Sequence, residues 1–152
     1  MIRKAALKDT SDILRLVNGH ARQGLMLAKS PYDVYRNILG FIVYVDDETG
    51  TVVGCSRLAV LWKDIGEVAS LAVDDRFKRM GIGRKLVEKC IETAKEIGLP
   101  KVIALTYQSA FFESVGFKKI NREDLPHKVF SDCIHCPKVD NCDECAYEFN
   151  IG

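Results

Sequence analysis

The chain contains 152 residues, with 22 basic and 21 acidic side chains and a formal net charge of +1 at pH 7. This near balance argues against a basic stripe for nucleic acid and a polybasic patch for a membrane surface. The sequence shows neither a signal peptide nor an apolar run long enough to cross a bilayer. We therefore expect a single cytoplasmic domain of the commonest domain size that folds without a partner.

The first third of the chain predicts one strand, two helices and two further strands. An edge strand is expected at residues 2–6, and Asp9 or Thr10 can cap a helix that faces inward with Ile13, Leu16, Val17 and Ala21. After a linker at residues 24–27, Ser30-Pro31 gives an N-cap with proline at the first helical position. This second helix would bury Val34, Tyr35, Ile38 and Leu39. Strands at 41–45 and 51–61 flank a turn-rich hairpin connection.

The most informative stretch joins a strand to a helix. Residues 67–73 alternate and then run apolar, as a buried strand does. A basic turn with Gly81 and Gly83 follows, and then a helix with the apolar stripe Leu86, Val87, Cys90, Ile91, Ala94 and Ile97. Gly98 and Pro100 end this helix. Glycines with basic neighbours at a helix start direct several backbone N–H groups toward one point, which predicts a phosphate-containing, nucleotide-like ligand.

The turn Lys78-Arg79-Met80-Gly81-Ile82-Gly83 resembles motif A of the GNAT superfamily of acyl-CoA N-acyltransferases, with Lys at the position of the usual Gln or Arg. Residues 110–117, after a strand at 102–105, resemble motif B of the same superfamily. The resemblance implies an α/β fold in α+β layers, with a mixed central sheet flanked by helices. It also implies acetyl-CoA as cosubstrate, with contacts from Leu71, Ala72, Val73, Lys78, Arg79, Met80, Gly81, Ile82, Gly83 and Arg84.

Acetyl transfer from a thioester to an amine needs a base, N–H donors that polarise the carbonyl, and a proton source, but no covalent enzyme intermediate. The resemblance points to Glu67 as the base, and a solvated strand-end carboxylate is the alternative. The motif B tyrosine that often acts as general acid is Phe112 here. Tyr107 is therefore the candidate acid and Ser109 the second choice, while a packing tyrosine remains the alternative for Tyr107.

The segments 105–117 and 125–138 resemble short stand-alone amino-acid N-acetyltransferases of the N-acetylglutamate synthase type, which acetylate glutamate at the entry to arginine biosynthesis. Candidate contacts for such a small acceptor are Arg3, Lys29, Ser30 and Arg57. Relatives often carry Arg where Lys29 and Ala69 stand, and bidentate Arg suits a dicarboxylate. Alternatives are therefore another amine as acceptor (a peptide or protein N-terminus, lysine or a polyamine) or a non-catalytic acyl-CoA-binding module. The sequence leaves a homodimer open.

Four of the six cysteines lie within thirteen residues of a C-terminal extension, residues 131–152, which we expect to pack on a catalytic domain of residues 1–130. Paired Cys-x-x-Cys units fit one structural zinc, because two thiolates from each of two turns complete a tetrahedron. The ligands would be Cys133, Cys136, Cys142 and Cys145. Two disulfides or free thiols are the alternatives. Cys55 and Cys90 are expected to pack in the core as small apolar side chains.

Overall fold

The computed structural model describes residues 1–125 and 145–152. The strands are β1 (Ile2–Lys4), β2 (Phe41–Val45), β3 (Val52–Trp62), β4 (Ile65–Val73), β5 (Lys101–Thr106), β6 (Lys118–Ile120) and β7 (Cys145–Asn150). The α-helices are α1 (Thr10–Arg22), α2 (Pro31–Asn37), α3 (Ile82–Glu96) and α4 (Ser109–Ser114), and short 3-10 helices include η2 (Ile38–Gly40) and η3 (Asp75–Phe77). No helix of these residues is long and apolar enough to span a membrane.

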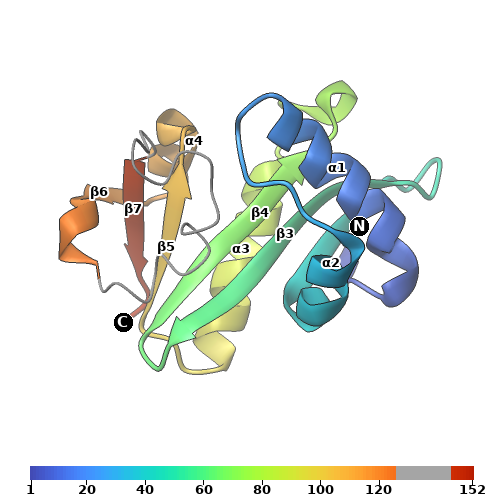
Figure 1. Cartoon of the computed structure of the whole chain (residues 1–152). Helices are drawn as coiled ribbons and strands as arrows, with labels where there is room; N and C mark the ends of the chain where they lie inside the picture. Colours follow the sequence, from blue (N-terminus) through green and yellow to red (C-terminus); the bar gives the residue numbers. More distant parts are fainter. Residues whose placement is uncertain (126–144) are drawn as a thin grey trace.

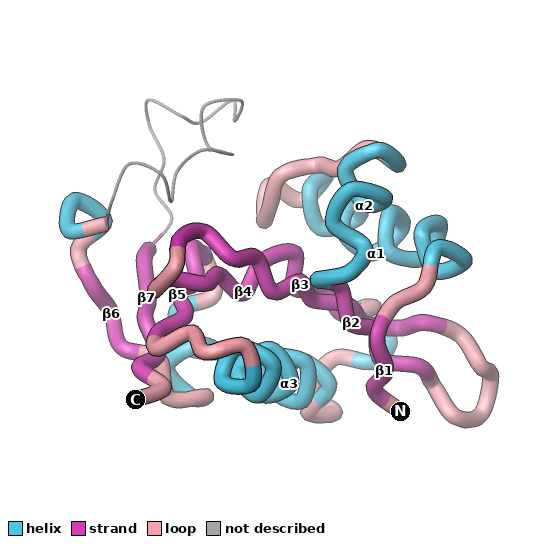
Figure 2. Tube along the Cα trace, turned by 90° about the horizontal axis from the view of Figure 1, so that it is seen from below, coloured by secondary structure: helices cyan, strands magenta, loops and turns pink. Residues whose placement is uncertain are grey.

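The described strands form one mixed sheet in the order β1-β2-β3-β4-β5-β7-β6. Helices α1 and α2 cover one face and α3 covers the other (Figure 2). Between the sheet and α3 lie Leu86, Val87, Cys90 and Ala94, four residues of the predicted apolar stripe. On the opposite face, Ile13, Leu16, Val17 and Val34 pack against inward-facing strand residues. The expected layered α/β fold is therefore confirmed.

Strands β4 and β5 are parallel neighbours that pair only briefly, at Gly66 with Val102 and at Glu67 with Ile103. The parallel pairing is made possible by the crossover through α3. Beyond these pairs the two strands separate toward their carboxyl ends (Figure 1). The backbone of β4 after Glu67 therefore borders a gap instead of a β5 ladder, which leaves main-chain groups there for a ligand.

A β-bulge interrupts β4 in the part that borders this gap. On β3, Cys55 pairs with Ala72 and Arg57 pairs with Ala69, so Ser70 and Leu71 together oppose a single residue. Ser70 has a φ of 55°, a left-handed conformation that is uncommon for residues other than glycine. A bulge of this kind changes the direction of the peptide between Ser70 and Leu71 relative to a regular strand.

Three predicted inward residues are wrong, and two of them lie at the end of a helix. Leu39 is 97% exposed, because α2 ends at Asn37 and the chain continues as η2, which changes the angular spacing of the side chains. Tyr35 is 52% exposed although it lies within α2, where it follows the buried Val34 and so points in a different direction around the helix. Ile97 is 57% exposed, because it is the C-cap of α3 and the chain leaves the helix at Gly98, which has a φ of 90°. A periodic pattern does not locate the last turn of a helix.

The two predicted helix starts differ in their chemistry. Ser30 caps α2 as expected: its Oγ accepts from the Asp33 N–H at 3.2 Å, and the Asp33 carboxylate accepts from the Ser30 N–H at 2.9 Å. Asp9 occupies the N-cap position of α1, but its side chain makes no capping bond there. Its carboxylate instead accepts from the Arg3 guanidinium and from the Ala6 N–H.

Two strands were absent from the sequence prediction, which ended with the motif B helix. Strand β6 follows α4, and β7 lies between β5 and β6. In β7 the side chain of Tyr147 is buried, and its hydroxyl donates to the Glu113 carboxylate at 3.0 Å. Residues 145–150 of the predicted extension therefore complete the central sheet.

Candidate active site

The basic turn and the start of α3 line a cavity of about 460 Å³, here called the turn cavity. Its walls comprise His20, Leu71, Val73, Phe77, Lys78, Arg79, Gly81, Ile82, Gly83, Arg84, Gln108, Phe111 and Ser114. Of the predicted cofactor contacts, Ala72 and Met80 are not in this wall. The side chain of Ala72 is buried against the α1 side of the sheet, and that of Met80 is exposed.

The two glycines of the turn have different physical roles. Gly81 is the N-cap of α3 and has a φ of 79°, and a Cβ added there would meet no protein atom within 4 Å. The space in front of it is therefore open to a ligand. A Cβ at Gly83 would lie 3.3 Å from the Phe111 ring, so this glycine lets Phe111 of α4 pack closely on α3. The first N–H groups of α3 lack helical partners and suit an anion.

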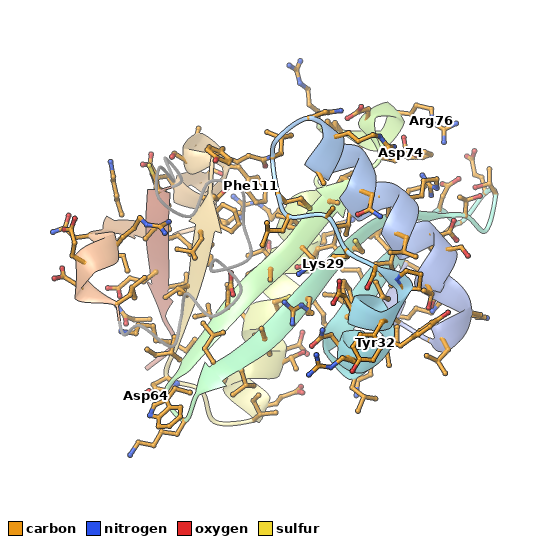
Figure 3. The ribbon with its side chains drawn as sticks, in the orientation of Figure 1. Lys29, Tyr32, Asp64, Asp74, Arg76 and Phe111 are labelled. Atoms are coloured by element: carbon orange, nitrogen blue, oxygen red, sulfur yellow. The ribbon has the colours of Figure 1, made fainter. Side chains whose placement is uncertain are left out.

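Asp74 caps the short helix η3, which precedes the basic turn. Its carboxylate accepts from the Arg76 guanidinium at 3.0 Å and from the Arg76 N–H at 3.0 Å. Arg15 of α1 donates to the same carboxylate at 3.2 Å and to the Val52 carbonyl at 2.8 Å. Asp74 and Arg76 lie next to each other at this end of the molecule (Figure 3). The hydrogen bonds from Arg76, together with the charge of Arg15, lower the pKa of Asp74 to about 2.

Replacing Asp74 with Asn is expected to lower the unfolding temperature, and this effect should depend on pH. The folded-state pKa of Asp74 lies below its ordinary value of 3.8, so its contribution to stability is present above pH 3.8 and is lost as pH falls toward 2. Thermal unfolding of wild type and Asp74→Asn should therefore differ at neutral pH and converge in acid. The exposed Asp64→Asn is the control, with wild-type unfolding at neutral pH. A wild-type advantage that persists unchanged at pH 2 would contradict the assignment.

A second cavity, of about 130 Å³ and here called the central cavity, lies beside the gap between β4 and β5. Its lining comprises Leu25, Met26, Leu27, Lys29, Arg57, Glu67, Val68, Ala69, Ser70, Leu71, Leu105, Thr106, Gln108 and Phe112. Two of these, Leu71 and Gln108, also line the turn cavity, so the two cavities meet there.

Besides Leu71, the central cavity brings together three of the predicted catalytic and acceptor-binding residues. Glu67 is held in β4 between β3 and β5, and Arg57 is a largely buried residue of β3. Lys29 comes from the loop after α1 and lies in front of β3 and β4 (Figure 3). Its backbone is fixed by Asn18, which accepts from the Lys29 N–H at 2.8 Å and donates to the Lys29 carbonyl at 3.0 Å. One carboxylate and two cations thus share one cavity.

Residues 14–117 of the chain match the model of the acetyltransferase (GNAT) family. The chain belongs to this family. An uncharacterized N-acetyltransferase of Chlorobaculum tepidum is 41% identical over 145 residues, which are 95% of this chain and 92% of that protein. An amino-acid acetyltransferase of Mycobacterium tuberculosis is 32% identical over 133 residues, 87% of this chain and 76% of that protein.

Solved structures agree with this assignment. A Mycobacterium tuberculosis protein in complex with CoA and the ligand NLQ superposes with a TM-score of 0.86 at 28% identity, covering 100% of this chain and 99% of that one. The N-acetylglutamate synthase of Neisseria gonorrhoeae, complexed with CoA and N-acetyl-glutamate, gives a TM-score of 0.89 at 25% identity. This chain spans 35% of the gonococcal enzyme. The protein is an acetyl-CoA-dependent N-acetyltransferase of the GNAT type.

Other predicted site residues of the acetyltransferase lie outside both cavities. Arg3 is on β1, at the far end of the sheet, where its guanidinium donates to both oxygens of Asp9 at 2.8 and 2.9 Å. Ser30 is exposed and caps α2. Tyr107 follows β5 and is half-buried, whereas its neighbour Gln108 lines both cavities. Roles for Arg3, Ser30 and Tyr107 in the reaction stay predictions.

Several lining residues of the acetyltransferase were not predicted. His20 of α1 is buried and lines the turn cavity, and its Nδ1 donates to the Leu16 carbonyl at 3.1 Å. His20 belongs to no motif, so nothing in the sequence around it indicates that it lines a ligand cavity. Leu25, Met26 and Leu27 form part of the central cavity. Three consecutive apolar residues in a loop are a signal for a ligand wall, which the prediction of a linker at residues 24–27 leaves out.

The predicted metal site lies mostly outside the described residues, which do not include Cys133, Cys136 and Cys142. Cys145 is described and opens β7, where it pairs with Thr106 of β5. Within residues 1–125 and 145–152, no three His, Cys, Asp or Glu side chains gather as metal ligands. The described part of the acetyltransferase gives the zinc hypothesis no support.

Proposed function

We propose that the protein transfers the acetyl group of acetyl-CoA to the α-amino group of an amino acid that carries a second carboxylate, with glutamate as the first choice. The observation that carries this proposal is the central cavity. There Glu67 lies with Lys29 and Arg57, and the cavity adjoins the turn cavity at Leu71 and Gln108. A base and two cations are the groups that an anionic amino acid needs.

The turn cavity would hold acetyl-CoA. Its pyrophosphate would bind at the N-terminus of α3, where free N–H groups combine with the positive charges of Lys78, Arg79 and Arg84. The pantetheine arm would run along the β4 backbone that borders the gap, toward Leu71. The thioester carbonyl would then lie at the junction of the cavities. Holding the thioester beside the amine supplies much of the acceleration, because acetyl-CoA is already activated.

In the proposed reaction, Glu67 accepts a proton from the acceptor ammonium, directly or through water, and the neutral amine attacks the thioester carbonyl carbon. The N–H of Leu71 stabilises the negative charge on the carbonyl oxygen of the tetrahedral intermediate. As the carbonyl re-forms, the C–S bond breaks, CoA leaves as the thiolate, and the attacking nitrogen gives up its second proton, which ends on the thiolate directly or through solvent. Tyr107 stays the candidate proton source for this thiolate. The products are the N-acetyl amino acid and CoA.

Two relatives support an amino-acid acceptor. The mycobacterial relative carries the name amino-acid acetyltransferase, and the gonococcal structure contains N-acetyl-glutamate with CoA. Arg57 can bind a carboxylate through its planar fork, whereas Lys29 offers a point charge. Acetylation of glutamate would place this protein at the entry to arginine biosynthesis, as its sequence resemblance implies.

The proposal is tested by measuring CoA release with acetyl-CoA and a panel of acceptors, with each product identified by mass. L-Glutamate should give the highest kcat/KM, followed by aspartate and glutamine, while spermidine and a lysine peptide should react poorly. Equal rates with glutamate and glutamine would show that the second carboxylate is not recognised. A preference for the polyamine or the peptide would overturn the amino-acid assignment, and no release with any acceptor would favour a binding module.

Replacing Lys29 with Met is expected to raise the KM for glutamate about tenfold or more, because a charge-assisted hydrogen bond contributes roughly 1.5–3 kcal/mol. The KM for acetyl-CoA should stay near the wild-type value, since Lys29 lines the central cavity and not the turn cavity. Initial-rate kinetics in both substrates separate the two effects. Lys63→Met, at the exposed hairpin between β3 and β4, is the control. An unchanged KM for glutamate would remove Lys29 from the acceptor site.

A further inference from the structure

The strained bulge of β4 lies where the two cavities meet. Ser70 lines the central cavity, and Leu71 lines both cavities. The left-handed φ of 55° at Ser70 is held in place without a glycine. Such a conformation persists only where surrounding contacts determine it. The contacts of the Ser70 peptide therefore determine how the backbone C=O and N–H groups are oriented where the two cavities meet.

A buried thiol contacts this peptide. Cys55 of β3 is 0% exposed, and its Sγ lies 3.5 Å from the Ser70 carbonyl oxygen, to which the S–H donates. Burial raises the pKa of Cys55 to about 12. The side chain therefore stays a protonated thiol, and hence a donor, throughout the physiological range.

The direction of the Ser70 carbonyl also sets the direction of the Leu71 N–H. The Ser70 carbonyl and the Leu71 N–H belong to one peptide unit, and the described chain contains no cis peptide bond. In a trans peptide the C=O and N–H point in opposite directions. Because the carbonyl points toward Cys55, the Leu71 N–H points away from Cys55, and Leu71 itself lines both cavities.

We propose that Cys55 is a positioning residue: its thiol holds the Ser70 carbonyl and so fixes the Leu71 N–H where the thioester carbonyl arrives. This inference rests on the proposed function, because it assumes that acetyl-CoA reaches the junction from the turn cavity. Cys55 itself touches neither substrate. It would act only by orienting one backbone donor, the Leu71 N–H. This donor would face the thioester carbonyl oxygen, on which negative charge develops in the transition state.

Cys90 provides a matched control for Cys55. It is also a buried cysteine, 2% exposed, and its Sγ lies 3.4 Å from the Oγ of Ser56, the residue next to Cys55. Cys90 packs on the α3 face of the sheet, whereas Cys55 belongs to the core under α1. Its removal should therefore cost similar packing without touching the Ser70 peptide.

The test compares Cys55→Ala, Cys55→Ser, Cys55→Val and Cys90→Ala in the full chain, with kcat and the Kd for acetyl-CoA as readouts. Cys55→Ala should lower kcat about tenfold or more with little change in the Kd, because a misplaced donor acts on the transition state. Cys55→Ser should recover most of the kcat, since its hydroxyl donates to the same carbonyl. Cys55→Val fills the space of the cysteine without a donor and should behave like Cys55→Ala. If Cys55→Ala does not fold, Cys55→Val replaces it in the test.

A second readout requires no substrate. The Cα and Cβ chemical shifts of Ser70 report its backbone conformation, and they should move toward strand values in Cys55→Ala and Cys55→Val but not in Cys55→Ser or Cys90→Ala. Normal kcat and unchanged Ser70 shifts in both donorless variants would overturn the proposal. An equal loss of kcat in Cys90→Ala would also overturn it. An inactive wild type would count against the proposed function, and the Ser70 shifts would still decide the role of Cys55.

Discussion

Replacing Glu67 with Gln should lower kcat about 100-fold or more, because loss of a general base costs two or more orders of magnitude. The Kd for acetyl-CoA should remain close to the wild-type value. Glu67 lines the central cavity only, and its backbone is fixed on both sides by pairing with Ala59 and Ile103. Gln keeps the size of the side chain and removes its basicity. Steady-state rates and calorimetric binding of acetyl-CoA measure the two quantities separately.

Glu96→Gln makes the same chemical change at an exposed position near the end of α3 and should leave kcat unchanged. A Glu67→Gln enzyme with normal turnover across the pH range would place the base elsewhere or leave deprotonation to solvent.

Replacing Gly81 with Val should weaken acetyl-CoA binding about 100-fold or more. Its φ of 79° disfavours any side chain, and the open space in front of it is where the pyrophosphate would approach the backbone. A β-branched side chain would occupy that space and turn the first N–H groups of α3 away. Calorimetric titration with acetyl-CoA measures the loss directly.

Gly50 separates backbone strain from the loss of the ligand site. It has a φ of 72° and no protein atom within 4 Å of an added Cβ, as at Gly81, but it lies in the hairpin between β2 and β3. Gly50→Val should lose a similar amount of stability and keep its affinity for acetyl-CoA. Unchanged affinity in a folded Gly81→Val variant would remove the turn from the acetyl-CoA site.

The turn cavity was largely predictable because its signals are local. Strand, basic glycine turn and amphipathic helix follow one another in the sequence, and each has its own pattern of side chains. The central cavity was less predictable. Its charged lining comes from distant parts of the sequence, Lys29, Arg57 and Glu67. These residues share one cavity because of the register of β3 with β4 and the two hydrogen bonds between the Asn18 side chain and the Lys29 backbone.

Other features depend on pairings that a single sequence does not reveal. The sequence predicts Arg3 as an acceptor contact but does not reveal its two hydrogen bonds to Asp9 on the β1 side of the sheet, and its role in the reaction stays a prediction. The alternation of residues 145–150 contained a strand signal, which the nearby cysteine spacing obscured. The bulge at Ser70 has no sequence signature, because a non-glycine residue there gives no sign of a left-handed φ.

If an acetyl-CoA site and an anionic amino-acid site meet at Leu71 and Gln108, one linked ligand should occupy both. A conjugate in which the CoA sulfur is joined through a carbonylmethyl bridge to the α-nitrogen of L-glutamate would span both cavities. Its affinity, measured by calorimetry, should exceed that of CoA about 100-fold, because linked groups bind as one molecule. It should also exceed the matched 4-aminobutyrate conjugate, which lacks the α-carboxylate, about tenfold. Equal affinities for CoA and both conjugates would show that the two sites do not meet there.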